Sequence, residues 1–146
     1  MTAIKRTATV PFSAAQMYAL VADIPAYPEF LPWCGGARVL SQSGKEVLAA
    51  IDIRYGGLHK TFTTRNRLHK DTMIEMQLVE GPFSRLQGCW RFDVLGDTVC
   101  RISLDLDFEV ANRLFGLVLG RMFFNIANEM VDSFRQRAVQ LYGTRA

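Results

Sequence analysis

The sequence predicts an α+β fold in which a strongly curved antiparallel sheet wraps around one long C-terminal helix. Three observations carry this prediction. Residues 36–110 form successive segments of alternating apolar and polar side chains joined by short turns, which is typical of an antiparallel meander with one buried face. Residues 112–142 repeat apolar side chains at helical spacing. A strand and a short helix precede both regions, and a curved sheet can bury the apolar face of the long helix.

Length and composition limit the class of protein. A chain of 146 residues can build its own core, so we predict a single domain over residues 1–146. The net charge of +3 is too small to indicate a DNA partner. Three cysteines without C-x-x-C spacing favour reduced thiols over disulfides or a metal site. The sequence shows no signal-like segment and no membrane-spanning run, which predicts a cytoplasmic protein.

The first part of the chain predicts a strand, a helix and an irregular segment. Residues 4–10 alternate as in a half-buried strand, which Pro11 ends. Ser13 is the predicted N-cap of a helix over residues 14–23. The segment 23–34, DIPAYPEFLPWC, holds three prolines and three large aromatic residues, so it favours neither a regular helix nor a central strand. Because it is too apolar for a solvated loop, we expect it to pack against another part of the protein.

Six further strands follow this segment. Their alternation is clearest in the last one, where Cys100 to Phe108 supply the apolar positions and Asp105, Asp107 and Glu109 share the polar face. The predicted strands cover residues 38–43, 46–55, 58–70, 72–80, 85–95 and 98–110. Together with the first strand they make a seven-stranded sheet.

The long helix is predicted to start after an N-cap at Asn112 and to stop at Gly143. Its polar face carries Arg121, Asn125, Asn128, Asp132 and Gln136. The opposite, sheet-facing side carries Phe115, Leu119, Phe123, Ile126, Met130, Phe134 and Leu141. This division predicts that one side of the helix is buried against the sheet along its whole length.

Two features of the helix call for an explanation. Small residues on the sheet-facing side, Gly116, Gly120 and Ala127, indicate either a close approach of helix and sheet or an internal cavity. An apolar cluster of Leu114, Leu117, Val118 and Phe124 points to the other side and needs a cover. We expect the segment 23–34 to supply that cover.

Three motifs resemble a known family. YPEFLPWC (27–34), GPFSRLQGCWRF (81–92) and SFRQRAVQLYG (133–143), in this order, are similar to the coenzyme Q-binding family of START-type domains, in the polyketide cyclase and lipid transport superfamily. The resemblance covers essentially the whole chain. It implies the helix-grip fold, a deep apolar cavity between sheet and helix, and a prenylated quinone as the ligand.

The sequence gives little sign of catalysis. Nucleophile-elbow, P-loop and dinucleotide-binding motifs are absent from it. His59 and His69 would lie about 33 Å apart on one unbent strand, so they cannot share a metal or a catalytic site. Asp105, Asp107 and Glu109 form a solvated charge row without an apolar wall to raise a pKa. We therefore predict a protein that is not an enzyme, although members of the superfamily that cyclise polyketides keep a cyclase-like activity as an alternative.

The preferred function is non-catalytic binding of a hydrophobic ligand. The resemblance implies ubiquinone or a related polyprenyl lipid, bound without a required cofactor, in support of respiratory electron transport and with transient contact to the inner membrane. Apolar surface alone suffices to hold such a tail. Asn66 is the main polar group on an inward-facing position, either as a satisfied core amide or as a donor to a carbonyl oxygen. The predicted ligand-binding residues are Tyr27, Phe30, Leu31, Trp33, Asn66, Trp90, Phe92, Phe115, Leu119, Phe123 and Ile126.

Ribosome binding is the alternative function. The same family includes a bacterial ribosome association toxin, so the resemblance implies a ribosomal subunit as a second kind of partner. Arg65 and Arg67 line the outward face of the strand 58–70 and are the predicted contacts to ribosomal RNA. The residues by themselves are more typical of a solvated strand face, so this alternative depends on the resemblance more than on the residues. The segment 23–34 is interpreted as a lid at the cavity mouth.

Overall fold

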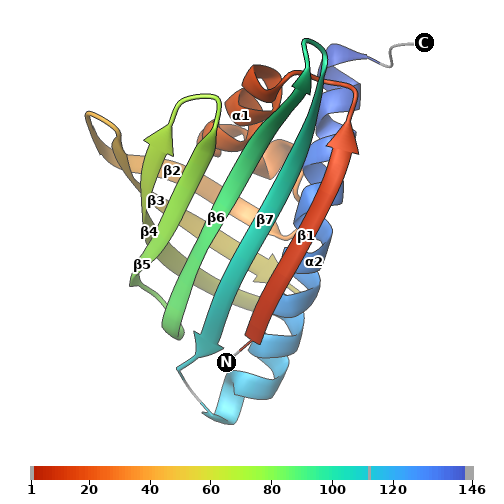
Figure 1. Cartoon of the computed structure of the whole chain (residues 1–146). Helices are drawn as coiled ribbons and strands as arrows, with labels where there is room; N and C mark the ends of the chain where they lie inside the picture. Colours follow the sequence, from red (N-terminus) through yellow and green to blue (C-terminus); the bar gives the residue numbers. More distant parts are fainter. Residues whose placement is uncertain (1, 112, 144–146) are drawn as a thin grey trace.

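The computed structural model describes residues 2–111 and 113–143, with the side chains of residues 113–115 outside the described part. Figure 1 shows a curved sheet with one long helix along its inner side. The elements follow in the order β1 (Thr2–Val10), α1 (Ala14–Ala22), η1 (Ile24–Glu29), β2 (Cys34–Ser43), β3 (Glu46–Tyr55), β4 (Leu58–His69), β5 (Met73–Glu80), β6 (Phe83–Gly96), β7 (Val99–Val110) and α2 (Arg113–Tyr142).

The seven strands form one antiparallel sheet in the order β1-β7-β6-β5-β4-β3-β2. Strands β2 to β7 are a meander in which each strand pairs with the next one along the chain. Strand β1 joins the free edge of β7, with Thr2 opposite Phe108 and Val10 opposite Cys100. The α+β class and the seven-stranded sheet around a C-terminal helix are therefore confirmed (Figure 1).

Alternation along the strands decides which face is buried. In β7 the side chains of Cys100, Ile102 and Leu104 are buried, whereas the intervening Arg101 and Ser103 are not. Successive strand side chains point to opposite faces, so the pattern places one face against α2 and the other towards solvent. All three cysteines are free thiols, as predicted.

Helix α1 begins at the predicted N-cap. The Ser13 hydroxyl oxygen accepts a hydrogen bond from the backbone N–H of Gln16 at 3.1 Å. The Gln16 side-chain oxygen in turn accepts one from the backbone N–H of Ser13 at 3.0 Å. This reciprocal capping box satisfies two N–H groups that the helix itself leaves free.

The proline-aromatic segment 23–34 contains more regular structure than predicted. Residues Ile24–Glu29 form a 3₁₀ helix with Pro25 near its start and Pro28 inside it. A turn this short leaves its first donors without internal partners, so a proline near its start removes no needed bond. The side chains of Tyr27 and Leu31 point into the core and are 6% and 1% exposed.

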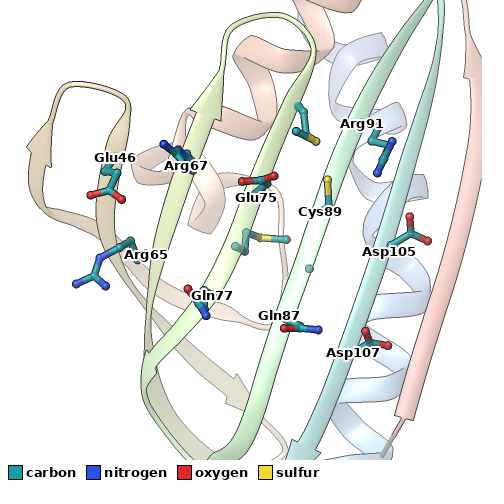
Figure 2. A pocket seen from close by; sticks show the side chains of 13 residues that line it. Glu46, Arg65, Arg67, Glu75, Gln77, Gln87, Cys89, Arg91, Asp105 and Asp107 are labelled. Carbon is teal, nitrogen blue, oxygen red and sulfur yellow. The ribbon is translucent and has the colours of Figure 1, made fainter.

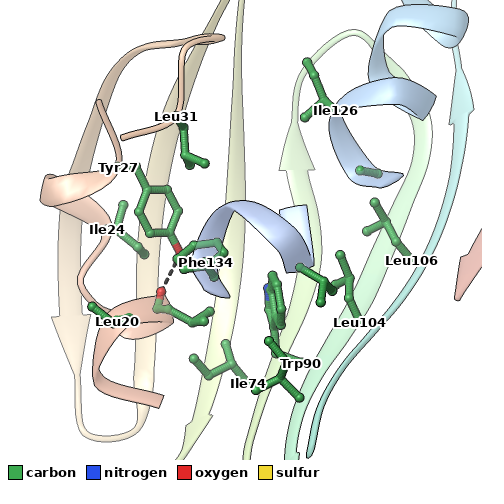
Figure 3. Packing of buried hydrophobic residues seen from close by; sticks show 14 of the residues in the cluster. Leu20, Ile24, Tyr27, Leu31, Ile74, Trp90, Leu104, Leu106, Ile126 and Phe134 are labelled. Atoms are coloured by element: carbon green, nitrogen blue, oxygen red, sulfur yellow. Dashed lines mark hydrogen bonds between the residues drawn. The ribbon is translucent and has the colours of Figure 1, made fainter. Parts of the chain in front are cut away.

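Tyr27 anchors this segment. Its hydroxyl donates a hydrogen bond to the backbone oxygen of Val21, the dashed line in Figure 3. Its ring meets the ring of Phe134 edge-on, with 5.5 Å between centroids. The segment is thus fixed both to the end of α1 and to the C-terminal half of α2.

The segment does not cover the apolar cluster at the start of α2, so that prediction is wrong. Leu117, Val118 and Phe124 remain 80%, 69% and 41% exposed. A helix of 30 residues is about 45 Å long, and the segment lies along its middle and C-terminal part, beside Ile126 and Phe134, away from its first turns. Leu114, the fourth predicted member, lies outside the described side chains.

The sheet-facing side of α2 is buried as predicted over its middle. Leu119, Phe123, Ile126 and Phe134 are at most 5% exposed, and Met130 is half-buried. Leu141 is 52% exposed, contrary to the prediction, because it lies in the last turn of the helix, beyond the buried middle.

The predicted ends of α2 and its two internal glycines agree with the structure only in part. The predicted N-cap, Asn112, lies outside the described residues. Gly143 ends the helix with a φ of 79°, and its N–H donates to the backbone oxygen of Val139 at 2.8 Å, as expected for a glycine stop. A Cβ at Gly116 would meet no atom within 4 Å, and one at Gly120 would make ordinary contact with Val110. Neither glycine is therefore required by a close approach of helix and sheet.

Replacing Tyr27 by Phe is expected to lower the free energy of unfolding by about 1–2 kcal/mol, because the buried backbone oxygen of Val21 loses its donor. Tyr55→Phe is the matched control: its side chain is 53% exposed, so we expect a change within about 0.5 kcal/mol. Urea denaturation of the two variants measures both values. Equal stability of the two variants would show that the Tyr27 hydroxyl does not anchor the segment.

Candidate functional site

An internal cavity of about 70 Å³ lies between the sheet and α2. Its wall is almost entirely apolar, with side chains from η1, from five of the strands and from the middle of α2. Figure 3 shows Trp90, Leu104 and Leu106 on the sheet side and Ile126 on the helix side of this region.

Strand alternation explains why large side chains meet here. Trp90 in β6 lies opposite Leu104 in β7, and both point to the face that α2 covers. The Trp90 ring packs edge-on against Phe134 of α2, with centroids 5.2 Å apart. The small side chain of Ala127 on the same helix also borders the cavity. Larger side chains before and after Ala127 in the helix hold it away from the sheet, and the small side chain leaves the space between them unfilled.

Few polar groups face the cavity. The Thr64 hydroxyl donates to the side-chain oxygen of Asn66 at 2.9 Å, which leaves the Asn66 amide nitrogen as the donor that this pair can offer a ligand. Burial raises the pKa of Tyr27 well above its usual range, so its hydroxyl stays neutral and bonded to Val21. The described lining contains no His, Asp, Glu or Lys. Such a wall suits an apolar guest with a carbonyl-like oxygen.

The predicted ligand-binding residues divide into four groups. Those bordering the cavity are Tyr27, Trp33, Asn66, Trp90, Phe123 and Ile126. Those buried elsewhere in the core are Leu31, Phe92 and Leu119. Phe30 lines a neighbouring surface groove instead, and the side chain of Phe115 lies outside the described part.

Sequence reasoning missed several lining residues. Thr64, Met76, Leu104, Leu106 and Met130 border the cavity, as does Ala127, one of the small helix residues that the sequence associated with a possible cavity. Strand parity placed the strand members of this set on the inner face but gave no sign of where along each strand the cavity lies. Met76 lies opposite Asn66 across β4 and β5, a pairing that depends on the register.

A surface groove of about 490 Å³ lies beside the cavity. It runs between residues 30–33, which precede β2, the end of β3 and the exposed side of α2. Trp33 and Ile126 border both the groove and the cavity, and they are only 8% and 4% exposed. Arg54 and Arg137 lie along the groove. The groove and the cavity thus share a wall of two apolar side chains.

A second depression of about 490 Å³ lies on the opposite, outward face of the sheet. Figure 2 shows its charged side chains standing in rows across β3 to β7. In one row Glu46 faces Arg67, Arg67 faces Glu75, and Asp105 faces Lys5 across the neighbouring strands. Cys89 stands between Glu75 and Asp105 in this row, so positive and negative groups are mixed on this face without strict alternation.

Arg65 and Arg67 are exposed on the outward face, as predicted. Their surroundings differ, because Arg67 lies between Glu46 and Glu75, whereas Arg65 lies between the uncharged Leu48 and Gln77. The sequence predicted a basic strand but not the acidic groups on the strands beside it, which follow from register. Arg65 is consequently the better placed of the two to meet an anion.

The remaining ionisable groups indicate no reactive centre. Burial raises the pKa of the Cys100 thiol to about 11, so it stays protonated at neutral pH. His69 lies 3.6 Å from Glu75 on the outward face. Among the described residues, no cluster of three His, Cys, Asp or Glu side chains could hold a metal ion. Within the same residues, no helix has the length and apolarity needed to cross a membrane.

Comparison with known proteins gives matches along nearly the whole chain. Residues 10–135 match the family model described as polyketide cyclase / dehydrase and lipid transport. The ribosome association toxin RatA of Escherichia coli is 48% identical over 99% of this chain and 92% of its own. RatA of Pseudomonas aeruginosa is 46% identical over 97% and 99%. The coenzyme Q-binding protein COQ10 homolog B of Xenopus laevis is 27% identical over 90% of this chain and 56% of its own.

Two solved structures have the same fold. A START superfamily protein of Mycobacterium smegmatis superposes with a TM-score of 0.82 at 22% identity, covering 95% of this chain and 98% of its own. The Zhui aromatase/cyclase of Streptomyces superposes with a TM-score of 0.80 at 16% identity, covering 99% of both chains. At such identities the likeness concerns the fold alone.

A larger side chain at the cavity wall tests whether the cavity can accept added atoms without strain. We expect Ala127→Val to change the free energy of unfolding by less than about 1 kcal/mol, because its added methyl groups enter the cavity. The matched control is Ala138→Val on the same helix, where the side chain is 0% exposed and borders none of the cavities described above. Overpacking there is expected to cost about 1–3 kcal/mol. Equal losses in the two variants, measured by urea denaturation, would mean that no usable space exists beside Ala127.

Proposed function

Since this chain belongs to the polyketide cyclase / dehydrase and lipid transport family, we propose that it acts as a ribosome association factor of the RatA kind. The family is the one that its three sequence motifs indicate. Within that family the near full-length relatives at 43–48% identity carry the RatA name, apart from one at 48% that is named persistence and stress-resistance toxin PasT, whereas the COQ10 relative stands at 27%. This difference carries the proposal and reverses the order of preference that the sequence motifs alone support.

The outward face of the sheet is the proposed contact surface. It is broad, and Arg65 offers it a guanidinium whose cross-strand neighbours are uncharged. The mixed charges around Arg67, Glu75 and Asp105 argue against binding to RNA phosphates through positive charge alone. They favour a surface in which a few arginine–phosphate contacts combine with polar contacts to ribosomal RNA or protein.

Arg65→Glu is expected to weaken co-sedimentation with ribosomal subunits about tenfold or more and to reduce its salt dependence, because one phosphate contact is lost and a repulsion is added. Arg67→Glu is expected to have a smaller effect, because Arg67 is already flanked by two carboxylates. Arg121→Glu, on the exposed face of α2, has the same change in charge and is the matched control.

Binding measured at two salt concentrations separates the possible results. Equal losses for Arg65→Glu and Arg121→Glu would leave only a net-charge effect and would reject this surface. Absence of binding by the unmodified protein at low salt would reject the ribosome proposal itself.

Hydrophobic-ligand binding is the second candidate function. The observation that favours it is the apolar cavity, bordered by two tryptophans and offered one amide donor by Asn66. The COQ10 relative supports a prenylated quinone as the ligand, with the ring carbonyl near Asn66 and the tail along the apolar wall. Transient contact with a membrane, from which such a lipid is taken, belongs to this candidate.

The size of the cavity sets a condition on this function. Small-molecule sites usually enclose about 300–1,000 Å³, far more than the 70 Å³ present between sheet and helix. A quinone would enter only if the wall rearranges. Met76 and Met130 are suited to this, because unbranched thioether side chains adapt to new shapes at little cost.

Ala127→Leu is expected to reduce binding of a short-chain ubiquinone analogue at least tenfold, because the larger side chain occupies the cavity. Quenching of Trp33 and Trp90, the only two tryptophans, measures the binding. Val118→Leu, which enlarges an exposed residue of the same helix, is the control. Lipid extraction of the purified protein followed by mass spectrometry adds an independent readout. No quenching and no co-purified lipid would exclude this candidate and leave ribosome association unaffected.

A further inference from the structure

We propose that the surface groove beside α2 is the entrance of the internal cavity and that its two arginines select amphiphiles with an anionic, carboxylate-like head group. The inference rests on the second candidate function, hydrophobic-ligand binding. It adds the class of ligand, namely a single apolar chain that ends in an acidic group, and it assigns the selecting residues, Arg54 and Arg137.

The groove and the cavity adjoin each other at two side chains. Trp33 and Ile126 border both spaces, and each is apolar and nearly buried. A shift of these two side chains joins a polar groove of about 490 Å³ to an apolar cavity of about 70 Å³. This order of surfaces, polar outside and apolar inside, matches an amphiphile that enters with its chain first.

Arg137 lies at the wall of the groove in an unusual environment. Its side chain is only 16% exposed, and its Nη2 lies 3.0 Å from a carboxylate oxygen of Glu29. Its guanidinium carbon lies 5.0 Å from the centre of the Phe30 ring. Within the described part of the chain, its buried Nε has no hydrogen-bond partner.

That arrangement favours a second anion. A buried donor without an acceptor costs free energy, and a guanidinium binds a carboxylate best through two adjacent nitrogens. Glu29 uses Nη2 only, and its side chain is 63% exposed, so it is a weak, solvent-accessible partner. A ligand carboxylate in the groove would provide the acceptor that the Nε lacks.

Arg54 adds a second cation from the opposite side of the groove. A Cβ at Gly35 would lie 2.6 Å from the Arg54 Cδ, so the Arg54 side chain crosses the strand where the glycine leaves room. The backbone N–H of Arg54 also donates to the backbone oxygen of Trp33 at 2.7 Å, which ties this arginine to the shared wall. Any larger residue at position 35 would displace the guanidinium.

The rest of the lining fits an oxygen-rich head group. Asn125, Ser133, Gln136 and Gln140 supply amide and hydroxyl groups along α2. Glu129 is the carboxylate of the described lining, and Glu29 pairs with Arg137 from outside it, so the two arginines outnumber the carboxylates of the lining itself. The balance favours an anion over a cation and gives a neutral quinone no comparable advantage.

Two ligands with the same chain and different heads test the inference. We expect dodecanoate to bind about tenfold more tightly than dodecan-1-ol at neutral pH, the gain of about 1.4 kcal/mol that one charge-assisted contact provides. Tryptophan fluorescence reports both ligands, because Trp33 and Trp90 border the cavity. Arg54→Gln and Arg137→Gln are each expected to reduce the preference for the acid severalfold and to leave the affinity for the alcohol unchanged.

The matched control is Arg135→Gln, an exposed arginine two positions from Arg137 that pairs with Asp132 instead of lining the groove. Arg54 is exposed, so its variant is expected to fold even where Arg137→Gln proves unstable. Equal affinities for acid and alcohol, or tighter binding of a neutral quinone than of dodecanoate, would overturn the selectivity and leave the cavity function standing. Failure of all three to bind would reject hydrophobic-ligand binding as well.

Discussion

The packing of aromatic side chains between α2 and the sheet is the interaction on which the rest of the structure depends. Phe134 meets Tyr27, Phe30 and Trp90 edge-on at centroid distances of 5.2–5.5 Å. About three turns nearer the start of the helix, Phe123 makes the same kind of contact with Phe62, Phe83 and Phe108 of the sheet. These two clusters hold a long helix at two points, so the space between them is determined by the side chains that bridge it.

The internal cavity is a consequence of this two-point packing. Between the two aromatic clusters the helix presents Ala127 and the flexible Met130, which do not fill the distance that the rings set. The core therefore keeps a small apolar space between the two clusters. The residues that would contact a bound ligand are also the residues that pack α2 against the sheet. Substitutions of them are therefore expected to change both ligand affinity and the stability of the fold.

Strand β4 shows how one element serves two surfaces. Asn66 points inward to the cavity, whereas Arg65 and Arg67 on either side of it point outward. Because neighbouring strand residues face opposite sides, substitutions on the outer face alter a macromolecular contact without touching the cavity. The two proposed functions, ribosome association and ligand binding, therefore use opposite faces of the sheet, and mutations are expected to separate them.

Local patterns in the sequence determined most of the fold. Alternation fixed the strands and their buried faces, Ser13 and Gln16 fixed the start of α1, and Gly143 fixed the end of α2, because each depends on residues close in the chain. The sheet-facing residues at the middle of α2 followed from helical periodicity in the same way.

The tertiary structure alone decided the site. The position of the cavity depends on the register that sets Met76 opposite Asn66, and the charge pattern of the outer face depends on which strands lie beside Arg65 and Arg67. The segment 23–34 packs against Phe134, far from the exposed Leu117. The length of α2 and the path of the chain over the sheet determine which part of the helix this segment reaches. Such contacts join residues distant in sequence, so periodicity, which reports only local order, carries no information about them.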